Sequence, residues 1–232
     1  MKRLLAILLA LISLTAVLIW MMTSATKSYL LISLIILVLS MLPFFITFEK
    51  SRPSARELAL ISGITAIAVV SRAVFYLLPQ VKPIAAVVII GAVCMGAKAG
   101  YMIGAFSAFI SNFIFGQGAH TPFQMVALGL VGFISGLIFS KVKPDKITLS
   151  ATGFLLTFIV YGIIADTSTV MFMVTDFNIP AIVSVYAAGV PFSFVFALTT
   201  AVCLYVFGEQ FIIKLERINT KFGLYMEDSY AK

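Results

Sequence analysis

Long apolar runs separated by short polar breaks make up most of this chain. A helix needs about 20 apolar residues to cross a bilayer, and most of the runs approach that length. Pro, Gly or charged residues mark the breaks between them. The runs are 4–22, 29–48, 57–78, 84–97, 100–115, 122–140, 149–170 and 181–208. The pattern predicts an all-α integral membrane protein with eight transmembrane helices.

The composition agrees with this class. Hydrophobic residues make up 62% of the chain and charged residues 11%, with a mean hydropathy of +1.13. Soluble domains carry about 25% charged residues. The two cysteines, Cys94 and Cys203, lie within apolar runs and form no CxxC motif, which favours a role in core packing. The chain therefore has little mass outside the membrane.

The basic residues follow the breaks between the runs. If the N-terminus is cytoplasmic, Lys27 and Lys82 lie in outer loops and Arg72 lies within a run. The other thirteen of the sixteen basic residues then lie in inner segments, which is the bias of cytoplasmic loops. We therefore expect a multi-pass protein of the cell membrane with both termini cytoplasmic. The net charge of +7 reflects this topology and contact with anionic lipid, and predicts no nucleic-acid partner.

Four segments follow from the runs and the charges. They are two N-terminal transmembrane helices (1–48), a basic cytoplasmic connector (49–56), a six-helix core (57–208) and a polar cytoplasmic tail (209–232). Lys2 and Arg3 precede the first run as in a signal peptide. The run is longer than the usual apolar region of about 7–15 residues. We expect this helix to be retained, with cleavage as the alternative.

A short polar loop, NFIFGQGAHTPFQ at 112–124, separates two of the core runs. It contains the only histidine, His120, and two glycines, Gly116 and Gly118. Thr121 followed by Pro122 is a typical helix start, with Thr as N-cap. The loop is either part of a binding site, because polar groups beside hydrocarbon are costly unless they serve one, or a glycine turn with a good cap and a histidine facing water.

Polar and aromatic residues gather at the predicted outer ends of the core runs. Arg72 and Asp166 are the two charges within runs, and they could pair with each other, bind a ligand or extend to the interface. Such a concentration predicts an outward-facing pocket for a small, polar, ring-containing molecule. The candidate pocket residues are Arg72, Phe75, Tyr76, Gln80, Asn112, Gln117, Gly118, His120, Thr121, Gln124, Tyr161, Asp166 and Tyr186.

Small residues recur at helical spacing in three places. One set lies at positions 96, 100, 104 and 108, and another at 129, 132 and 136. Small residues at this spacing allow close helix packing, so both sets predict internal contacts. The third set, Ala55, Ala59 and Gly63, begins just outside the membrane on the cytoplasmic side. It is therefore a candidate interface with a partner protein.

The sequence lacks the combinations of residues that membrane enzymes use for catalysis. The single histidine has no flanking carboxylates for a metal site, and the chain contains no P-loop motif. Ser135, in a glycine-flanked motif, is fifteen residues from His120, or roughly 22 Å along a helix. We therefore expect no enzyme activity and no metal, and any nucleotide must be used by other subunits.

Several short motifs follow one another between residues 56 and 139. In order they are Arg-Glu-Leu-Ala at 56–59, Ser-Arg-Ala at 71–73, Pro-Gln at 79–80, Lys-Pro at 82–83, Gly-Ala-Lys-Ala-Gly at 96–100, Ser-Asn-Phe at 111–113, Phe-Gly-Gln-Gly at 115–118, Thr-Pro-Phe-Gln-Met at 121–125 and Gly-Leu-Val-Gly at 129–132. Their order and spacing resemble the substrate-binding S component of energy-coupling factor (ECF) vitamin transporters. The resemblance covers residues 55 to about 208 as six helices, and the two leading helices depart from it.

The resemblance implies a module without ATPase activity or covalently bound cofactor. It would capture a vitamin at its outer face, join a transmembrane coupling subunit and two ATPase subunits that use ATP, and topple to release the vitamin inside. Ala55, Ala59 and Gly63 would pack against the coupling subunit. The Gly-Gln-Gly and Thr-Pro-Phe-Gln motifs are most similar to cobalamin-linked S components, so cobalamin or a related corrinoid is the expected ligand. The alternatives are another vitamin or small cofactor precursor, or a membrane scaffold without a ligand.

Overall fold

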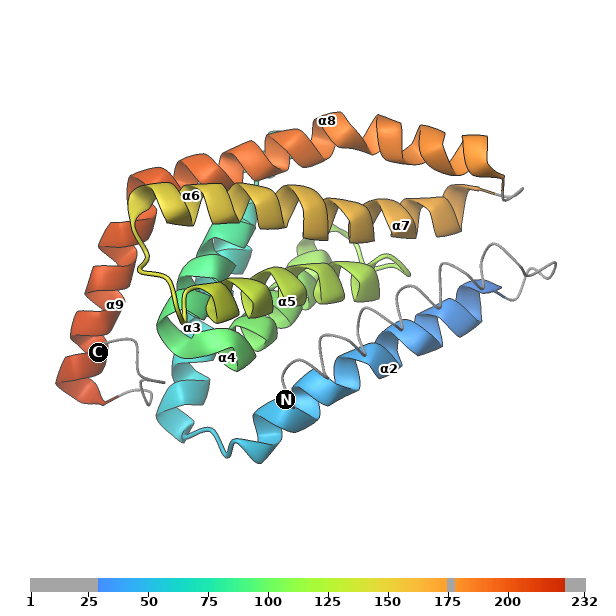
Figure 1. Cartoon of the computed structure of the whole chain (residues 1–232). Coiled ribbons are helices and arrows are strands. Elements are labelled where there is room, and N and C mark those ends of the chain that lie inside the picture. The colour runs from blue at the N-terminus through green and yellow to red at the C-terminus, as the bar shows by residue number, and fades with distance from the viewer. Residues whose placement is uncertain (1–28, 175–177, 224–232) are drawn as a thin grey trace.

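The computed structural model describes residues 29–174 and 178–223, and every regular element in these residues is helical (Figure 1). The predicted first transmembrane helix, 4–22, lies outside the described residues. The elements are α2 (Tyr29–Lys50), α3 (Ala55–Val74), α4 (Ile84–Phe115), α5 (Thr121–Ile138), α6 (Lys146–Leu155), the π-helical η1 (Leu156–Tyr161), α7 (Gly162–Met173), α8 (Ile179–Cys203), the π-helical η2 (Leu204–Gly208) and α9 (Glu209–Phe222). The expected all-α class is confirmed.

Among the described residues, five helices are long and apolar enough to cross a membrane, so the expectation of eight is wrong. They are Ala55–Val74, Ile84–Phe115, Thr121–Ile138, Lys146–Met173 and Ile179–Lys221. The predicted run 29–48 forms helix α2, which is not among the five. The runs 84–97 and 100–115 share the single element α4. The tail after residue 208 begins as α9, which follows α8 through η2 and turns away from the direction of α8 (Figure 1).

A sharp turn inside α4 lies at the predicted break between the runs 84–97 and 100–115. Gly96 has φ 85° and ψ 173°, outside the helical region. A Cβ atom at Gly100 would lie 2.5 Å from the Cβ of Ala92, although eight residues span roughly 12 Å in a straight helix. The chain therefore reverses at Gly96. The part before the turn is only twelve residues, or roughly 18 Å, which is too short to cross the hydrocarbon core alone.

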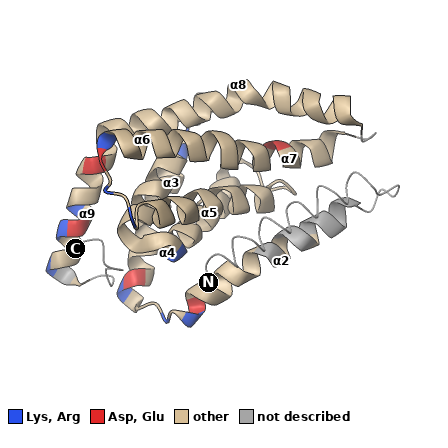
Figure 2. Ribbon diagram, viewed as in Figure 1, with Lys and Arg blue, Asp and Glu red and all other residues tan. Residues whose placement is uncertain are grey.

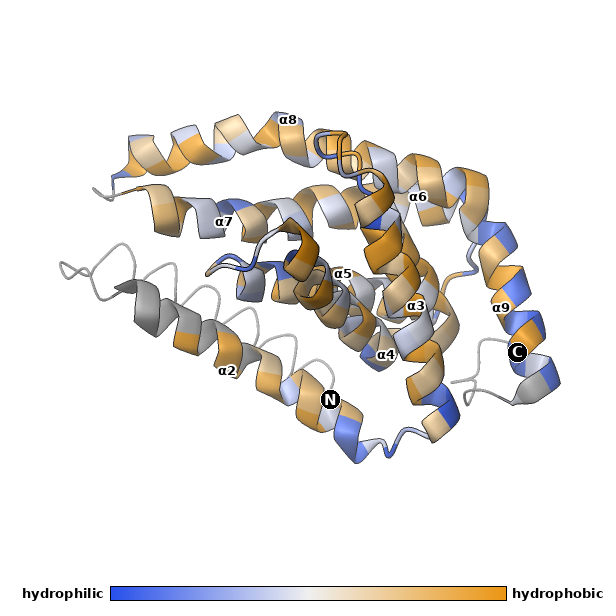
Figure 3. Ribbon diagram, turned by 180° about the vertical axis from the view of Figure 1, so that it is seen from behind, coloured by the Kyte–Doolittle hydropathy of each residue, from blue (hydrophilic) through white to orange (hydrophobic). Residues whose placement is uncertain are grey.

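The long pair formed by α6–α7 and α8 lies on one side of α5, and α2 lies on the other (Figure 1). Helix α2 joins the body through aromatic packing: the ring of Phe44 stacks on Tyr101 at 4.0 Å between centroids and meets the edge of Phe133 at 5.1 Å. Many large apolar side chains of α3 and α8 are exposed on the outside of the molecule, as expected for surfaces that face lipid (Figure 3).

Glycines join α4 and α5 so closely that backbone meets backbone. A Cβ at Gly100 would lie 2.7 Å from the carbonyl oxygen of Gly132, and one at Gly136 would lie 2.6 Å from the Cα of Ala97. A Cβ at Gly104 would overlap the carbonyl of Leu128. The small-residue sets of α4 and α5 therefore form one internal seam, as the spacing predicted.

We expect Gly104→Ala to destabilise the protein, because the added methyl group meets backbone that cannot move aside. Overpacking of this kind costs about 1–3 kcal/mol. Gly63→Ala is the matched control, since no atom lies within 4 Å of its Cβ position and the change should be neutral or stabilising by up to about 1 kcal/mol. Thermal unfolding of the purified proteins measures both, and equal melting temperatures would contradict the seam.

Candidate substrate-binding site

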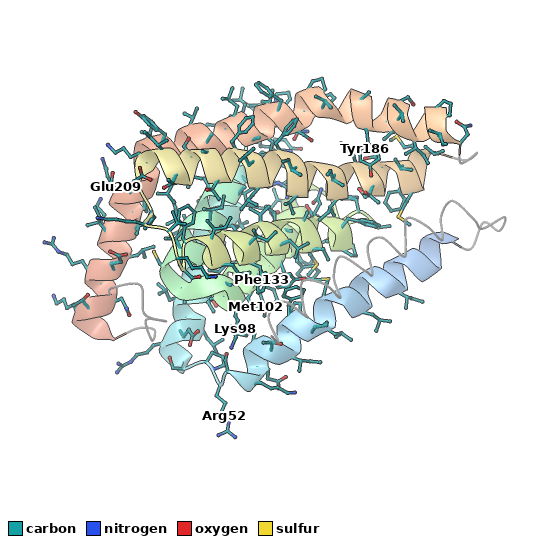
Figure 4. The ribbon with its side chains drawn as sticks, viewed as in Figure 1. Arg52, Lys98, Met102, Phe133, Tyr186 and Glu209 are labelled. Carbon is teal, nitrogen blue, oxygen red and sulfur yellow. The ribbon has the colours of Figure 1, made fainter. Side chains whose placement is uncertain are left out.

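A cavity of about 680 Å³ opens between α7 and α8 on one side and α5 and the connector 75–83 on the other. Its polar lining residues are Arg72, Gln80, Lys82, His120, Gln124, Asp166, Ser168, Thr169 and Ser193. The rest of the wall is Tyr161, Ala165, Phe172, Met173, Val185, Ala188, Gly189, Phe192 and Phe196. The cavity lies toward the end of the α7–α8 pair at which Figure 4 labels Tyr186, away from Glu209.

The structure divides the candidate pocket residues into two groups. Those that line the cavity are Arg72, Gln80, His120, Gln124, Tyr161 and Asp166. Those that do not line it are Phe75, Tyr76, Asn112, Gln117, Gly118, Thr121 and Tyr186. The first group comes from five different parts of the chain, which the fold brings to one hollow. Of the second group, Asn112 donates to or accepts from lining residues directly.

Asn112 is the centre of a buried hydrogen-bond network behind the cavity. It is 0% exposed, although it lies near the end of a helix. Its Oδ1 accepts from Nη1 of Arg72 at 3.0 Å, and its Nδ2 donates to Oε1 of Gln124 at 2.9 Å and to Oγ1 of Thr121 at 3.1 Å. Because one amide can both accept and donate, Asn112 fixes a cation and an amide of the cavity wall together.

The loop after α4 is held by its own polar groups. Oγ1 of Thr121 donates to Oε1 of Gln117 at 2.9 Å and accepts from the backbone N–H of Gly118 at 3.2 Å. Nε2 of Gln117 donates to the carbonyl of Phe109 at 2.9 Å. Gly116 has φ 104°, which favours glycine. Gln117 thus closes the loop and does not line the cavity.

The expectation that Thr121 caps α5 is wrong. His120 occupies the N-cap position without a side-chain capping bond, and Thr121 is already the first helical residue. Its hydroxyl is used by the loop and by Asn112 instead. The side chain of His120 is thereby left to line the cavity beside Gln124, one turn further along α5.

Two cations meet over one aromatic ring at the edge of the cavity. The guanidinium carbon of Arg72 lies 4.2 Å from the ring centroid of Phe115, and Nζ of Lys82 lies 5.7 Å from it. The ring of Tyr76 packs against the same ring, with 5.1 Å between centroids. Burial, followed by the charge of Arg72, lowers the pKa of Lys82 below its usual value.

Arg72 is 8% exposed, and its Nε has no hydrogen-bond partner among the described residues. A buried donor without a partner is costly. The side chain is held instead by Ser111 and Asn112 through Nη1 and by the face of Phe115. This corner of the cavity is therefore positive and offers donors.

Asp166 faces the cavity from the opposite wall. It makes no ion pair with Arg72 in the described structure, so the hypothesis that the two charges pair is wrong. Its carboxylate lies against the backbone of α8 at Gly189, where any Cβ would overlap both oxygens. Next to it on α7, Thr167 exchanges a hydrogen bond of 2.8 Å with the hydroxyl of Tyr186. Tyr186 therefore joins α7 to α8 beside the cavity.

Sequence reasoning missed two thirds of the residues that line the cavity. Ser168 and Thr169 follow Asp166 in an apolar run, and this polar cluster was a signal that could have been found. The face that α8 presents, at 185, 188, 189, 192, 193 and 196, follows helical periodicity. The sequence could not distinguish this face from the lipid-facing side of α8, because α8 is mainly apolar on every side.

The fold and the site define a helical membrane protein with a cavity for a small molecule between its helices. The sequence model of the family described as "ECF-type riboflavin transporter, S component" matches residues 52–212, more than half of the chain. The chain therefore belongs to this family of transporter subunits, which are not enzymes. Comparisons with curated proteins and with solved structures gave no match.

The family corrects the expected ligand. The expectation of cobalamin is not supported, because the matching S components are of the riboflavin type. The alternative of another vitamin agrees better with this finding. In the structure, Gln117 and Thr121, from the two motifs that suggested cobalamin, close the loop and do not line the cavity.

We expect Asn112→Ala to lower thermal stability, because it leaves Arg72 and Gln124 without their shared partner in a buried place. A lost partner of this kind costs about 1–3 kcal/mol. Gln117→Ala is the control, because Gln117 makes its side-chain hydrogen bonds in an exposed loop. Losing them should lower the free energy of unfolding by about 0.5–1.5 kcal/mol at most. If thermal unfolding finds the smaller loss for Asn112→Ala, the network does not centre on that residue.

Proposed function

We propose that this chain is the riboflavin-binding subunit of an ECF-type importer, and that the cavity between α5, α7 and α8 holds the vitamin. The observation that carries this proposal is the uneven lining of the cavity. Aromatic side chains from α7 and α8 line one part of it, and cations, amides and hydroxyls line the rest. Riboflavin has the same division: a flat fused ring system, apolar at one end and polar at the other, with a chain of hydroxyls.

The ring system fits the part of the wall formed by Phe172, Phe192 and Phe196. Flat rings gain from stacked or edge contacts with such side chains. The carbonyl groups at the polar end of the flavin are acceptors, and Arg72 and Lys82 offer donors that the described residues leave without carboxylate partners.

The hydroxyl chain of riboflavin fits the wall that carries Asp166. A carboxylate accepts hydrogen bonds from hydroxyl groups, and Ser168, Thr169 and Ser193 can both donate and accept. Gln80, His120 and Gln124 complete the contact from the connector and from α5. Tyr161 belongs to the aromatic wall. The remaining candidates, Phe75, Tyr76, Asn112, Gln117, Gly118, Thr121 and Tyr186, support these groups from behind.

The transport cycle needs an energising module, which S components of this family join. We propose that a transmembrane coupling subunit and two ATPase subunits supply it, and that Ala55, Ala59 and Gly63 of α3 meet the coupling subunit. In support, these three residues are exposed, and Gly63 has no atom within 4 Å of its Cβ position. A partner helix could approach this backbone closely.

The orientation with both termini in the cytoplasm remains part of the proposal. Many described basic residues lie toward the ends of the helices that meet near α9 and the start of α3, whereas the acidic position on α7 lies nearer the other end of the α7–α8 pair (Figure 2). This distribution favours a cytoplasmic position for the basic end. The cavity would then open toward the outside, where the vitamin is captured.

We expect His120→Ala and Gln124→Ala each to weaken riboflavin binding by roughly 2- to 13-fold, the value of one neutral hydrogen bond. Calorimetry with the purified protein, or quenching of riboflavin fluorescence, measures the affinity.

Gln117→Ala is the matched control from the same loop, and its affinity should stay within about twofold of the unaltered protein. Equal weakening by all three changes would place the ligand in the loop and not in the cavity. Absence of riboflavin binding by the unaltered protein, with another vitamin bound in its place, would overturn the proposed substrate.

We expect Ala59→Leu combined with Gly63→Leu to leave riboflavin affinity unchanged and to weaken co-purification with the coupling and ATPase subunits. Bulky side chains on a small-residue surface keep two helices apart. Val70→Leu is the control, because it lies on the same exposed face of α3 and further toward the other end. Normal assembly of the double variant would rule out this surface.

A further inference from the structure

The last helical stretch is too long for the membrane. The segment Ile179–Lys221 contains 43 residues, or roughly 65 Å of helix, about twice the 30 Å of a hydrocarbon core. Figure 1 shows α9 leaving the direction of α8 after η2, and a π-helical segment is a common cause of such a bend. Helix α9 therefore continues outside the hydrocarbon core.

The start of α9 is fixed at one end of the transmembrane body. Its first residue, Glu209, lies 4.0 Å from Nζ of Lys146, the first residue of α6. Lys141 and Lys143, in the connector just before α6, are exposed. Helix α9 thus begins where α6 enters the membrane, at a level where headgroups surround the protein.

Helix α9 has three different faces. Ile212 and Asn219 are buried against the body of the protein. Beside them, Phe211 and Ile218 are seven residues apart and share one face. Their side chains are 45% and 42% exposed, so the protein itself does not cover this apolar strip.

The next face of α9 is basic. Lys214 and Arg217 are exposed, and Lys214 borders the apolar strip, with its Nζ 6.0 Å from the ring centroid of Phe211. Figure 3 shows hydrophobic and hydrophilic positions alternating along α9, whereas α8 is mainly hydrophobic. An exposed apolar strip next to a basic strip is the pattern of helices that lie in the membrane interface.

We propose that α9 lies along the surface of the adjoining leaflet, with Phe211 and Ile218 at the acyl boundary and Lys214 and Arg217 against anionic phospholipid headgroups. The charges are complementary, and the apolar strip is removed from water by the same placement. Each basic residue near the surface favours an anionic lipid by roughly fivefold. This inference does not depend on which vitamin the cavity holds.

The test uses the full-length protein in phosphatidylcholine nanodiscs, with Cys94→Ala and Cys203→Ala as the background. A fluorescent label is attached at Ile218→Cys or, as the matched control, at Thr220→Cys, which is exposed and turned about 160° from Ile218. Roughly 30% of the lipid is brominated phosphatidylglycerol or, in a second sample, brominated phosphatidylcholine at the same fraction. Bromine on the acyl chains quenches only a label that reaches them.

We expect the label at 218 to be quenched and the label at 220 to remain bright. Quenching at 218 should be several-fold stronger with brominated phosphatidylglycerol than with brominated phosphatidylcholine. Lys214→Gln with Arg217→Gln should abolish that difference while quenching by the chains persists. Phe211→Cys repeats the measurement on the same strip should Ile218→Cys lower the melting temperature.

Three results would overturn the proposal. Label 218 as bright as label 220 would show that the strip does not reach the acyl chains. Equal quenching by the two lipids would remove the preference for anionic headgroups. A label at 218 that is bright in lipid and becomes shielded only when the coupling and ATPase subunits are added would make α9 a protein-docking helix.

Discussion

The contact of backbone with backbone between α4 and α5 is the constraint on which the rest of this structure depends. Gly100, Gly104, Gly132 and Gly136 leave no room for a side chain between the two helices. In a membrane, helices do not gain by leaving water, so close packing and satisfied hydrogen bonds must hold them together. The same contact brings the end of α4 beside the start of α5. Every polar group behind the cavity depends on that approach.

The seam makes possible the network around Asn112. A polar group in hydrocarbon is tolerated only if its hydrogen bonds are made, and Asn112 makes them to Arg72, Thr121 and Gln124. The cost of burying these groups is thereby met within the protein. Arg72 and Gln124 are thereby held in place at the cavity wall, and side chains fixed in this way need no further ordering.

The two ends of the molecule use the same kinds of residue differently. Glycine at Gly104 is covered by backbone, whereas glycine at Gly63 faces open space. Aromatic residues at Phe192 and Phe196 line a cavity, whereas Phe211 on α9 lies exposed beside a lysine. One end therefore encloses a cavity. The other leaves a small-residue surface and an apolar strip exposed.

The sequence by itself determined the class of this protein, since apolar runs with basic breaks leave few alternatives to a helical membrane protein. It also predicted that the small-residue sets of α4 and α5 lie at internal contacts, because small residues at helical spacing allow helix backbones to approach closely. It did not determine the number of membrane-spanning helices, because the part of α4 before the turn at Gly96 is apolar but too short to cross the hydrocarbon core alone. Nor did it separate Gln117, which closes a loop, from His120, which lines the cavity. Such roles depend on which side-chain donors and acceptors are already engaged in other hydrogen bonds. The α8 residues line the cavity only because of how α8 packs against the other helices. Only the tertiary structure decides these contacts, because they join residues far apart in the chain.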